Sequence, residues 1–212
     1  MDVRHPAPVS VIDRPRQRRR NTAGNERLTA WVGGTLFVLL AIEGLTIVSI
    51  RALLVPHVVV GMLIGAAAGL KILSTGYRFM RYYSGDAAYR KKGPPAPLLR
   101  ILGPLVILTT VAVIATGILL LYVPVGRMGQ LLQWHQASFV LWFLVMSVHV
   151  LTYIWRVPAL ILAEFSQRVP IGRPGRVLAL ALSLIVGAIG ALVVLGPTHS
   201  WLSTFLGGVT QH

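Results

Sequence analysis

Two histidines, His135 and His149, lie fourteen residues apart in the apolar stretch LLQWHQASFVLWFLVMSVHV. In an α-helix, that separation is a rotation about 40° short of four full turns and a rise of about 21 Å. Both imidazoles then face the same way at two heights. Within roughly 30 Å of hydrocarbon, such a pair places one nitrogen ligand near each leaflet, which is the geometry of two stacked metal-porphyrin sites.

A second apolar stretch repeats the spacing, with His57 followed fourteen residues later by Lys71. In an up-and-down bundle the two stretches run in the same direction, so we expect His57 to come level with His135 and Lys71 with His149. The first pair can then clamp an iron from both sides.

The second pair leaves three interpretations open. An inner haem has His149 and Lys71 as ligands, or His149 is its only protein ligand, or there is no inner haem. If there is no inner haem, Lys71 extends toward the cytoplasmic headgroups. If there is one, Lys71 could also pair with a haem propionate. We favour an inner haem, and the expected cofactor is one or two haems b.

Small residues could make room for a macrocycle between helices. Two glycines follow His57 at a spacing of four residues, and two others in a third apolar stretch are separated by fourteen residues. Each glycine alone also fits ordinary helix packing in a membrane. The candidate cofactor-binding glycines are Gly61, Gly65, Gly103 and Gly117.

Glu43 is an acidic residue within the first apolar stretch. A carboxylate at that depth must be protonated, paired or beside water. It is therefore a candidate for proton uptake at a quinone site or for contact with a cofactor, and a structural hydrogen bond is the alternative.

The elements that must position these residues are membrane spans. The chain is 55% apolar and only 12% charged, against roughly 25% charged residues in an average soluble domain. Since about 20 apolar residues cross the hydrocarbon, we expect an all-α integral membrane bundle, with a four-helix haem-binding core at 28–156 and a fifth transmembrane helix within 157–212. The expected spans are Leu28–Ile50, Ala52–Gly76, Ile101–Val123, Trp134–Trp155 and Val177–Leu195.

The basic residues predict the orientation. Of 20 Lys and Arg, 17 lie in the N-terminal segment and in the 77–100 and 156–176 segments, which share one side. The positive-inside rule then makes the N-terminus cytoplasmic and the C-terminus extracytoplasmic in a multi-pass plasma-membrane protein. We expect residues 1–27 to be a disordered basic tail. We also expect the net charge of +14 to orient the protein in the membrane and not to bind nucleic acid.

The absence of cysteine excludes disulfides, iron–sulfur clusters, thiolate-bound zinc and covalent c-type haem attachment. A metal in this chain must therefore use nitrogen or oxygen ligands.

The strings PHVVVG, LKILSTGYRFMRYYSGDAAYRKKGPP and LLQWHQASFVLWFLVMSVHV resemble short cytochrome b/b6-domain membrane proteins of actinobacteria. The histidines on alternate helices are similar to those of di-haem membrane cytochromes b, which include cytochrome b561 and the ferric-reductase-like domains. The resemblance implies noncovalent haem b, electron transfer through the bilayer, and ligand roles for His57, His135 and His149. The departure from a four-histidine pattern is Lys71.

We therefore expect an electron carrier between a quinol or other redox partner and a second partner. It could be the membrane subunit of a larger oxidoreductase, in a homo- or hetero-oligomer. Two alternatives remain: a non-redox proton or ion relay or transporter that uses Glu43, Lys71 and the histidines, and a haem-free assembly subunit.

Overall fold

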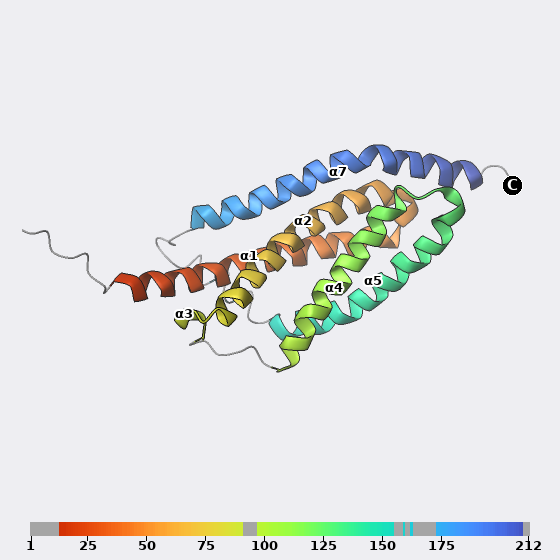
Figure 1. The fold of residues 1–212 in the computed structure, drawn as a ribbon. Coiled ribbons are helices and arrows are strands. Elements are labelled where there is room, and N and C mark those ends of the chain that lie inside the picture. Colours follow the sequence, from red (N-terminus) through yellow and green to blue (C-terminus); the bar gives the residue numbers. More distant parts are fainter. Residues whose placement is uncertain (1–12, 91–96, 155–158, 160–161, 163–172, 210–212) are drawn as a thin grey trace, which may run out of the picture.

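The regular structure in the described part of the chain is entirely helical (Figure 1). The computed structural model describes residues 13–90, 97–154, 159, 162 and 173–209. Its helices are α1 (Asp13–Val48), α2 (Ile50–Tyr83), α3 (Ala87–Arg90), α4 (Pro97–Leu120), α5 (Val125–Tyr153) and α7 (Arg173–Val209).

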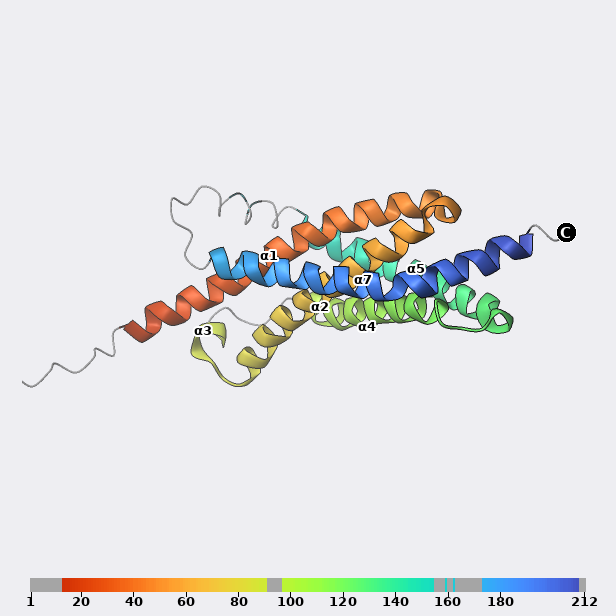
Figure 2. The same ribbon diagram turned by 90° about the horizontal axis from the view of Figure 1, so that it is seen from above.

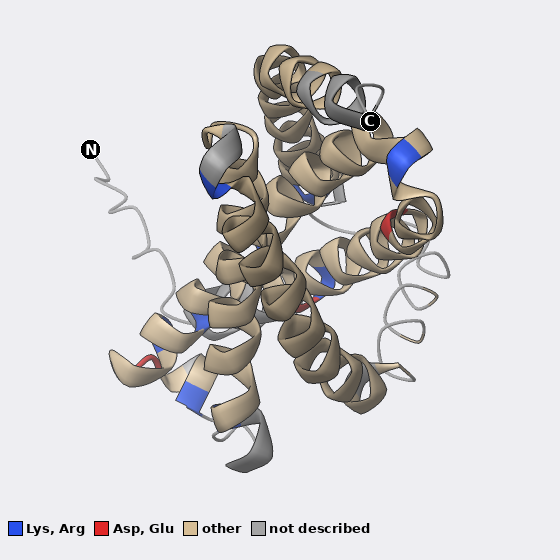
Figure 3. Ribbon diagram, turned by 90° about the vertical axis from the view of Figure 1, so that its right-hand side faces the viewer, with Lys and Arg blue, Asp and Glu red and all other residues tan. Residues whose placement is uncertain are grey.

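Five of these helices contain a stretch long and apolar enough to cross a membrane, as the sequence predicts. A helix suits this role because it satisfies its own backbone hydrogen bonds, which hydrocarbon cannot do. Figure 3 shows few charged residues along the helices, and large apolar side chains such as Leu144 and Leu192 are exposed. Exposed apolar side chains on this scale are expected where lipid is the solvent. The fold is that of a multi-pass helical membrane protein.

The helices form two groups. Helix α2 packs along both α1 and α7, whereas α4 packs along α5 (Figures 1 and 2). The α1–α2 turn, the α4–α5 turn and the end of α7 lie together at one end of the molecule, which we call the hairpin end (Figure 1). Helix α3 and the start of α1 lie at the opposite end, the α3 end.

The N-terminal segment differs from the expected disordered tail. Helix α1 already begins at Asp13, so residues 13–27 are helical and only residues 1–12 lie outside the described structure. The physical reason is that a membrane span provides a helix nucleus, and Arg, Gln, Ala and Glu extend it at little cost. Pro15 falls in the first turn, where its missing N–H is tolerated.

The turn between α1 and α2 is very short, and α2 is kinked just after it. Only Ser49 separates the two helices, and its carbonyl accepts hydrogen bonds from the N–H groups of Ala52 and Leu53. Leu53 has non-helical angles (φ −112°, ψ 20°), and Pro56 lies three residues further on. A proline inside a helix removes one backbone hydrogen bond and clashes with the preceding turn, which accounts for the kink.

Helix α7 is held against α2 by two glycines. A Cβ added at Gly187 would lie 2.9 Å from the Leu63 Cα and 3.1 Å from the Met62 carbonyl oxygen. At Gly190 it would lie 2.7 Å from the Met62 Cε. Close approach of this kind is how small residues associate helices in membranes.

Replacing Gly187 by Ala should therefore destabilise the protein, because the new methyl group meets backbone atoms of α2. We expect a loss of about 1–3 kcal/mol, seen as a lower Tm in detergent by tryptophan fluorescence. Gly69→Ala is the matched control, since nothing lies within 4 Å of its added Cβ. Equal Tm values for the two variants would show that Gly187 is not a packing contact.

Candidate functional site

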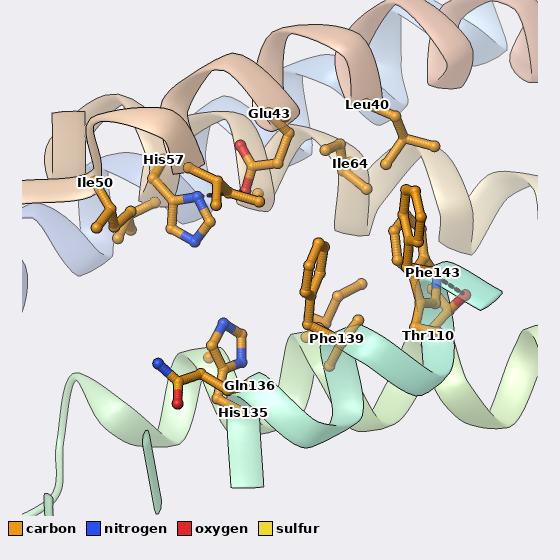
Figure 4. Close-up of a pocket in the computed structure, with 18 of the residues that line it drawn as sticks. Leu40, Glu43, Ile50, His57, Ile64, Thr110, His135, Gln136, Phe139 and Phe143 are labelled. Carbon is orange, nitrogen blue, oxygen red and sulfur yellow. Dashed lines mark hydrogen bonds and ion pairs between the residues drawn. The ribbon is translucent and has the colours of Figure 1, made fainter. Parts of the chain in front are cut away.

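A cavity of about 800 Å³ lies between the α1–α2 pair and the α4–α5 pair (Figure 4). Its volume falls within the range of about 300–1,000 Å³ that is usual for small-molecule and cofactor sites. The lining is mostly apolar, and the end of α7 contributes Trp201 and Leu202. The charged, amide, hydroxyl and imidazole side chains among the described lining residues are Glu43, Arg51, His57, Thr110, His135, Gln136 and Ser147.

His57 of α2 and His135 of α5 face each other across this cavity (Figure 4). Their ring centroids are 6.5 Å apart and their ring planes are inclined by 79°. The expectation that these two histidines lie at the same level is therefore met. The parallel course of α2 and α5 and the placement of each histidine near the hairpin end bring them together.

Helix α1 determines which nitrogen of His57 faces the cavity. The Nδ1 atom lies 2.9 Å from the Glu43 Oε1 and 3.1 Å from the Thr46 hydroxyl oxygen. The Thr46 hydroxyl donates its proton to the Glu43 carbonyl, at 2.6 Å, so toward His57 it can only accept. Both neighbours of Nδ1 are acceptors, which places the imidazole proton on Nδ1 and the lone pair on Nε2.

Helix α4 does the same for His135. Its Nδ1 lies 3.0 Å from the Thr116 hydroxyl oxygen, and that hydroxyl donates to the Ala112 carbonyl at 2.8 Å. The hydroxyl therefore accepts a hydrogen bond from the Nδ1–H of His135. Two Nε2 lone pairs consequently point toward each other across the gap (Figure 4).

The spacing of the two rings fits a metal ion held between them. A metal–nitrogen bond is about 2 Å long and the ring centroid lies roughly 1 Å beyond the nitrogen, so two imidazoles on opposite sides of one metal have centroids about 6 Å apart. The observed separation of 6.5 Å is close to this value. No group of three or more His, Cys, Asp or Glu in the described chain could hold a bare metal ion. A porphyrin brings four nitrogen ligands of its own, so two histidines are enough.

The pocket floor is aromatic and apolar. Phe139 lies on Trp142 with ring centroids 6.1 Å apart, and Phe143 is 6.0 Å from Phe139. The buried Trp142 indole donates to the Thr110 hydroxyl at 3.0 Å, which ties α5 to α4. Figure 4 shows the phenylalanine rings on the opposite side of the histidine pair from Gln136.

The four candidate glycines have different surroundings. A Cβ at Gly117 would lie 3.0 Å from the His135 Cε1, and a Cβ at Gly61 would lie 3.5 Å from the Glu43 Oε1. Both residues line the cavity, and their missing side chains leave room for His135 and Glu43. Gly65 instead meets Ile114, and nothing lies within 4 Å of a Cβ at Gly103.

The second expected pair, Lys71 and His149, lies outside the set of described residues that line the cavity. The Lys71 ammonium donates to the Thr29 carbonyl of α1 at 3.1 Å and lies 2.8 Å from where a Cβ of Gly33 would be. The absence of a side chain at Gly33 thus opens a place for this ammonium between α1 and α2. An inner haem that uses His149 remains a prediction.

Further polar contacts surround Lys71 at the α1–α2 contact. The Asn25 amide donates to the Ser74 carbonyl at 3.1 Å, and the Thr29 hydroxyl lies 3.3 Å from that of Ser74. Interhelical hydrogen bonds of this kind hold helices together in a membrane. The contacts of Lys71 therefore belong to a polar seam that joins α1 to α2.

Sequence reasoning identified the two facing histidines and Glu43, but it missed their orienting contacts. Thr46 and Thr116 are common residues in apolar helices and carry no signal on their own. The pairing of Glu43 with His57 could have been found, since the two residues flank a very short turn in a helical hairpin.

Comparisons of this chain with protein families, with curated proteins and with solved structures found no match to any of them.

Proposed function

We propose that this chain is a membrane cytochrome that holds one haem b between His57 and His135 and carries electrons between a quinol or other redox partner and a second partner. The observation that carries the proposal is the pair of Nε2 lone pairs that face each other at a ring separation of 6.5 Å. Bound there, the haem supplies a one-electron iron couple.

The protein's own part is to orient the ligands. Glu43 and Thr46 hold the His57 ring by its Nδ1, and Thr116 holds the His135 ring in the same way. Such contacts fix the tautomer and the direction of the metal-binding nitrogen, and a carboxylate partner also makes the imidazole a stronger ligand. With a histidine to hold the haem on each side, the site would suit electron transfer rather than the binding of a small molecule.

The mostly apolar lining of the cavity disfavours water at the site. Phe139, Trp142 and Phe143 cover the floor of the cavity. A protein sets the reduction potential of a haem through the ligands it supplies to the iron and through burial of the haem away from water.

The charge distribution gives the proposed direction across the plasma membrane. Most basic residues lie toward the α3 end, whereas Arg51 and Arg127 lie at the hairpin end. The positive-inside rule then places the N-terminus in the cytoplasm and the haem near the outer leaflet. An electron from a partner in the outer leaflet needs a second carrier to reach the cytoplasm, so a protein redox partner or a second haem fits this position.

Replacing either His57 or His135 by Ala should remove the haem, because each supplies one of the two axial nitrogens. The measurements are the dithionite-reduced α and Soret bands and a pyridine haemochrome assay, in which this site accounts for one haem per wild-type chain. His199→Ala is the matched control, since His199 of α7 is not among the described lining residues. Full haem retention in both ligand variants would overturn the proposal. A colourless wild-type protein from haem-replete cells would favour the proton relay or the assembly subunit.

Replacing Glu43 by Gln keeps an oxygen that can accept the Nδ1–H of His57 but removes the carboxylate charge. We expect the haem to remain bound and its midpoint potential to rise by on the order of 60 mV, because a weaker axial donor stabilises ferric iron less. A redox titration followed by absorbance measures this. Glu26→Gln at the α3 end, where Glu26 lies 3.6 Å from Arg78, is the control. An unchanged potential in Glu43→Gln would show that the carboxylate does not act on the ligand.

Replacing Lys71 by Met should leave the haem content and the visible spectrum unchanged, because its ammonium contacts the Thr29 carbonyl and not the cavity. The haemochrome assay and the reduced spectrum provide the measurement. Loss of one haem from a wild-type content of two would instead establish the inner site.

A further inference from the structure

The cavity lining differs between its two ends. It includes Arg51, in the first turn of α2 at the hairpin end, and Gln136, which lies on the opposite side of the histidine pair from the phenylalanine rings. Arg51 is the one Lys or Arg among the described residues that line the cavity, and Glu43 is the one acidic residue. Since Glu43 is engaged by His57, the charge of Arg51 is available to a ligand.

The α1–α2 turn puts Arg51 at the hairpin end, where it lines the cavity. Ser49 is the only residue between the helices, and the non-helical angles of Leu53 separate the first turn of α2 from the rest of that helix. The neighbours Ile50 and Leu54 line the cavity as well. The Arg51 side chain is exposed, and no Asp or Glu in the described structure pairs with it. A guanidinium in this position has its hydrogen-bond donors free for an anion.

We propose that Arg51 binds carboxylate side groups of the cofactor, with the Gln136 amide beside it, and so sets which edge of the macrocycle faces the hairpin end. This inference rests on the proposed function. Haem b carries two propionates on one edge and only methyl and vinyl groups on the opposite edge. The guanidinium forms paired hydrogen bonds with a carboxylate, and the apolar edge then lies against Phe139 and Phe143.

The alternative cation for this role is Lys71, which the structure does not favour. Its ammonium is held by the Thr29 carbonyl at the α1–α2 contact and lies outside the lining of the cavity. A lipid phosphate is an alternative partner for Arg51, since exposed cations near a membrane surface also attract headgroups. The experiment must therefore separate a porphyrin carboxylate from a lipid phosphate.

The test compares two ferric porphyrins on the full-length apoprotein, purified in one detergent from haem-depleted cells. Ferric haem b has free propionates, whereas its dimethyl ester is nearly the same shape without their charge. Soret titration gives the Kd of each for wild type, Arg51→Met and Arg127→Met. Arg127 is the matched control, because it is the other basic residue at the hairpin end and is not among the described lining residues.

We expect wild type and Arg127→Met to bind the free acid about threefold to tenfold more tightly than the ester, as suits a partly exposed ion pair. In Arg51→Met this preference should fall to about one, through weaker binding of the acid alone. Arg51→Lys should keep part of the preference, because it retains the charge but loses the paired geometry.

Other outcomes overturn the inference. If Arg51→Met keeps the preference for the acid, Arg51 does not hold the propionates and the inference fails. Equal weakening of both porphyrins would assign Arg51 to the fold, which the Tm of the variant checks independently. A wild type that binds both porphyrins equally has no carboxylate site. A wild type that binds neither overturns the proposed function itself, and that result is distinct from the others.

Discussion

The arrangement of this protein depends on two neutral imidazoles that present lone pairs to each other inside an apolar cavity. Each Nδ1–H donates to an oxygen of a neighbouring helix. For His57 the acceptors are Glu43 and Thr46, and for His135 the acceptor is Thr116. Two lone pairs that face each other repel. Under the proposed function, a positively charged centre between them would remove that repulsion. The same function would give a reason for a bilayer-spanning chain to place two imidazoles at one level.

The packing of the helices divides them into two groups, one on each side of the histidine pair. Helix α2 approaches both α1 and α7 closely at glycines, and α4 and α5 form a second pair. Between these groups lies the cavity of about 800 Å³. In a membrane, helices gain little from the hydrophobic effect and associate through packing and hydrogen bonds. Under the proposed function, a rigid planar ligand in the cavity would supply much of the contact between the two groups and would couple cofactor binding to assembly of the bundle.

Glu43 and Lys71 show two ways in which an ionisable side chain is accommodated in a membrane-spanning helix. Both are ionisable residues in spanning helices, where an unpaired charge is unfavourable. Glu43 accepts from a histidine of the next helix and lines the cavity, so its charge bears on the site. Lys71 donates to a backbone carbonyl above a glycine and belongs to a helix–helix seam. The contacts of Lys71 shown by the structure therefore join two helices, and its expected role as a ligand stays a prediction.

The sequence by itself determined the five apolar helices and the common level of His57 and His135, because span length and helical rise are fixed by the chain. It missed the helical start at Asp13, since a polar segment next to a span has no signal that separates helix from tail. Tertiary structure alone decided that Thr46 and Thr116 orient the imidazoles, that Gly117 makes room for His135, and that Arg51 lines the cavity. Those outcomes depend on a one-residue turn, a kink and the rotation of each helix about its axis. Periodicity fixes which residues share a helix face, and packing against neighbouring helices decides where that face points.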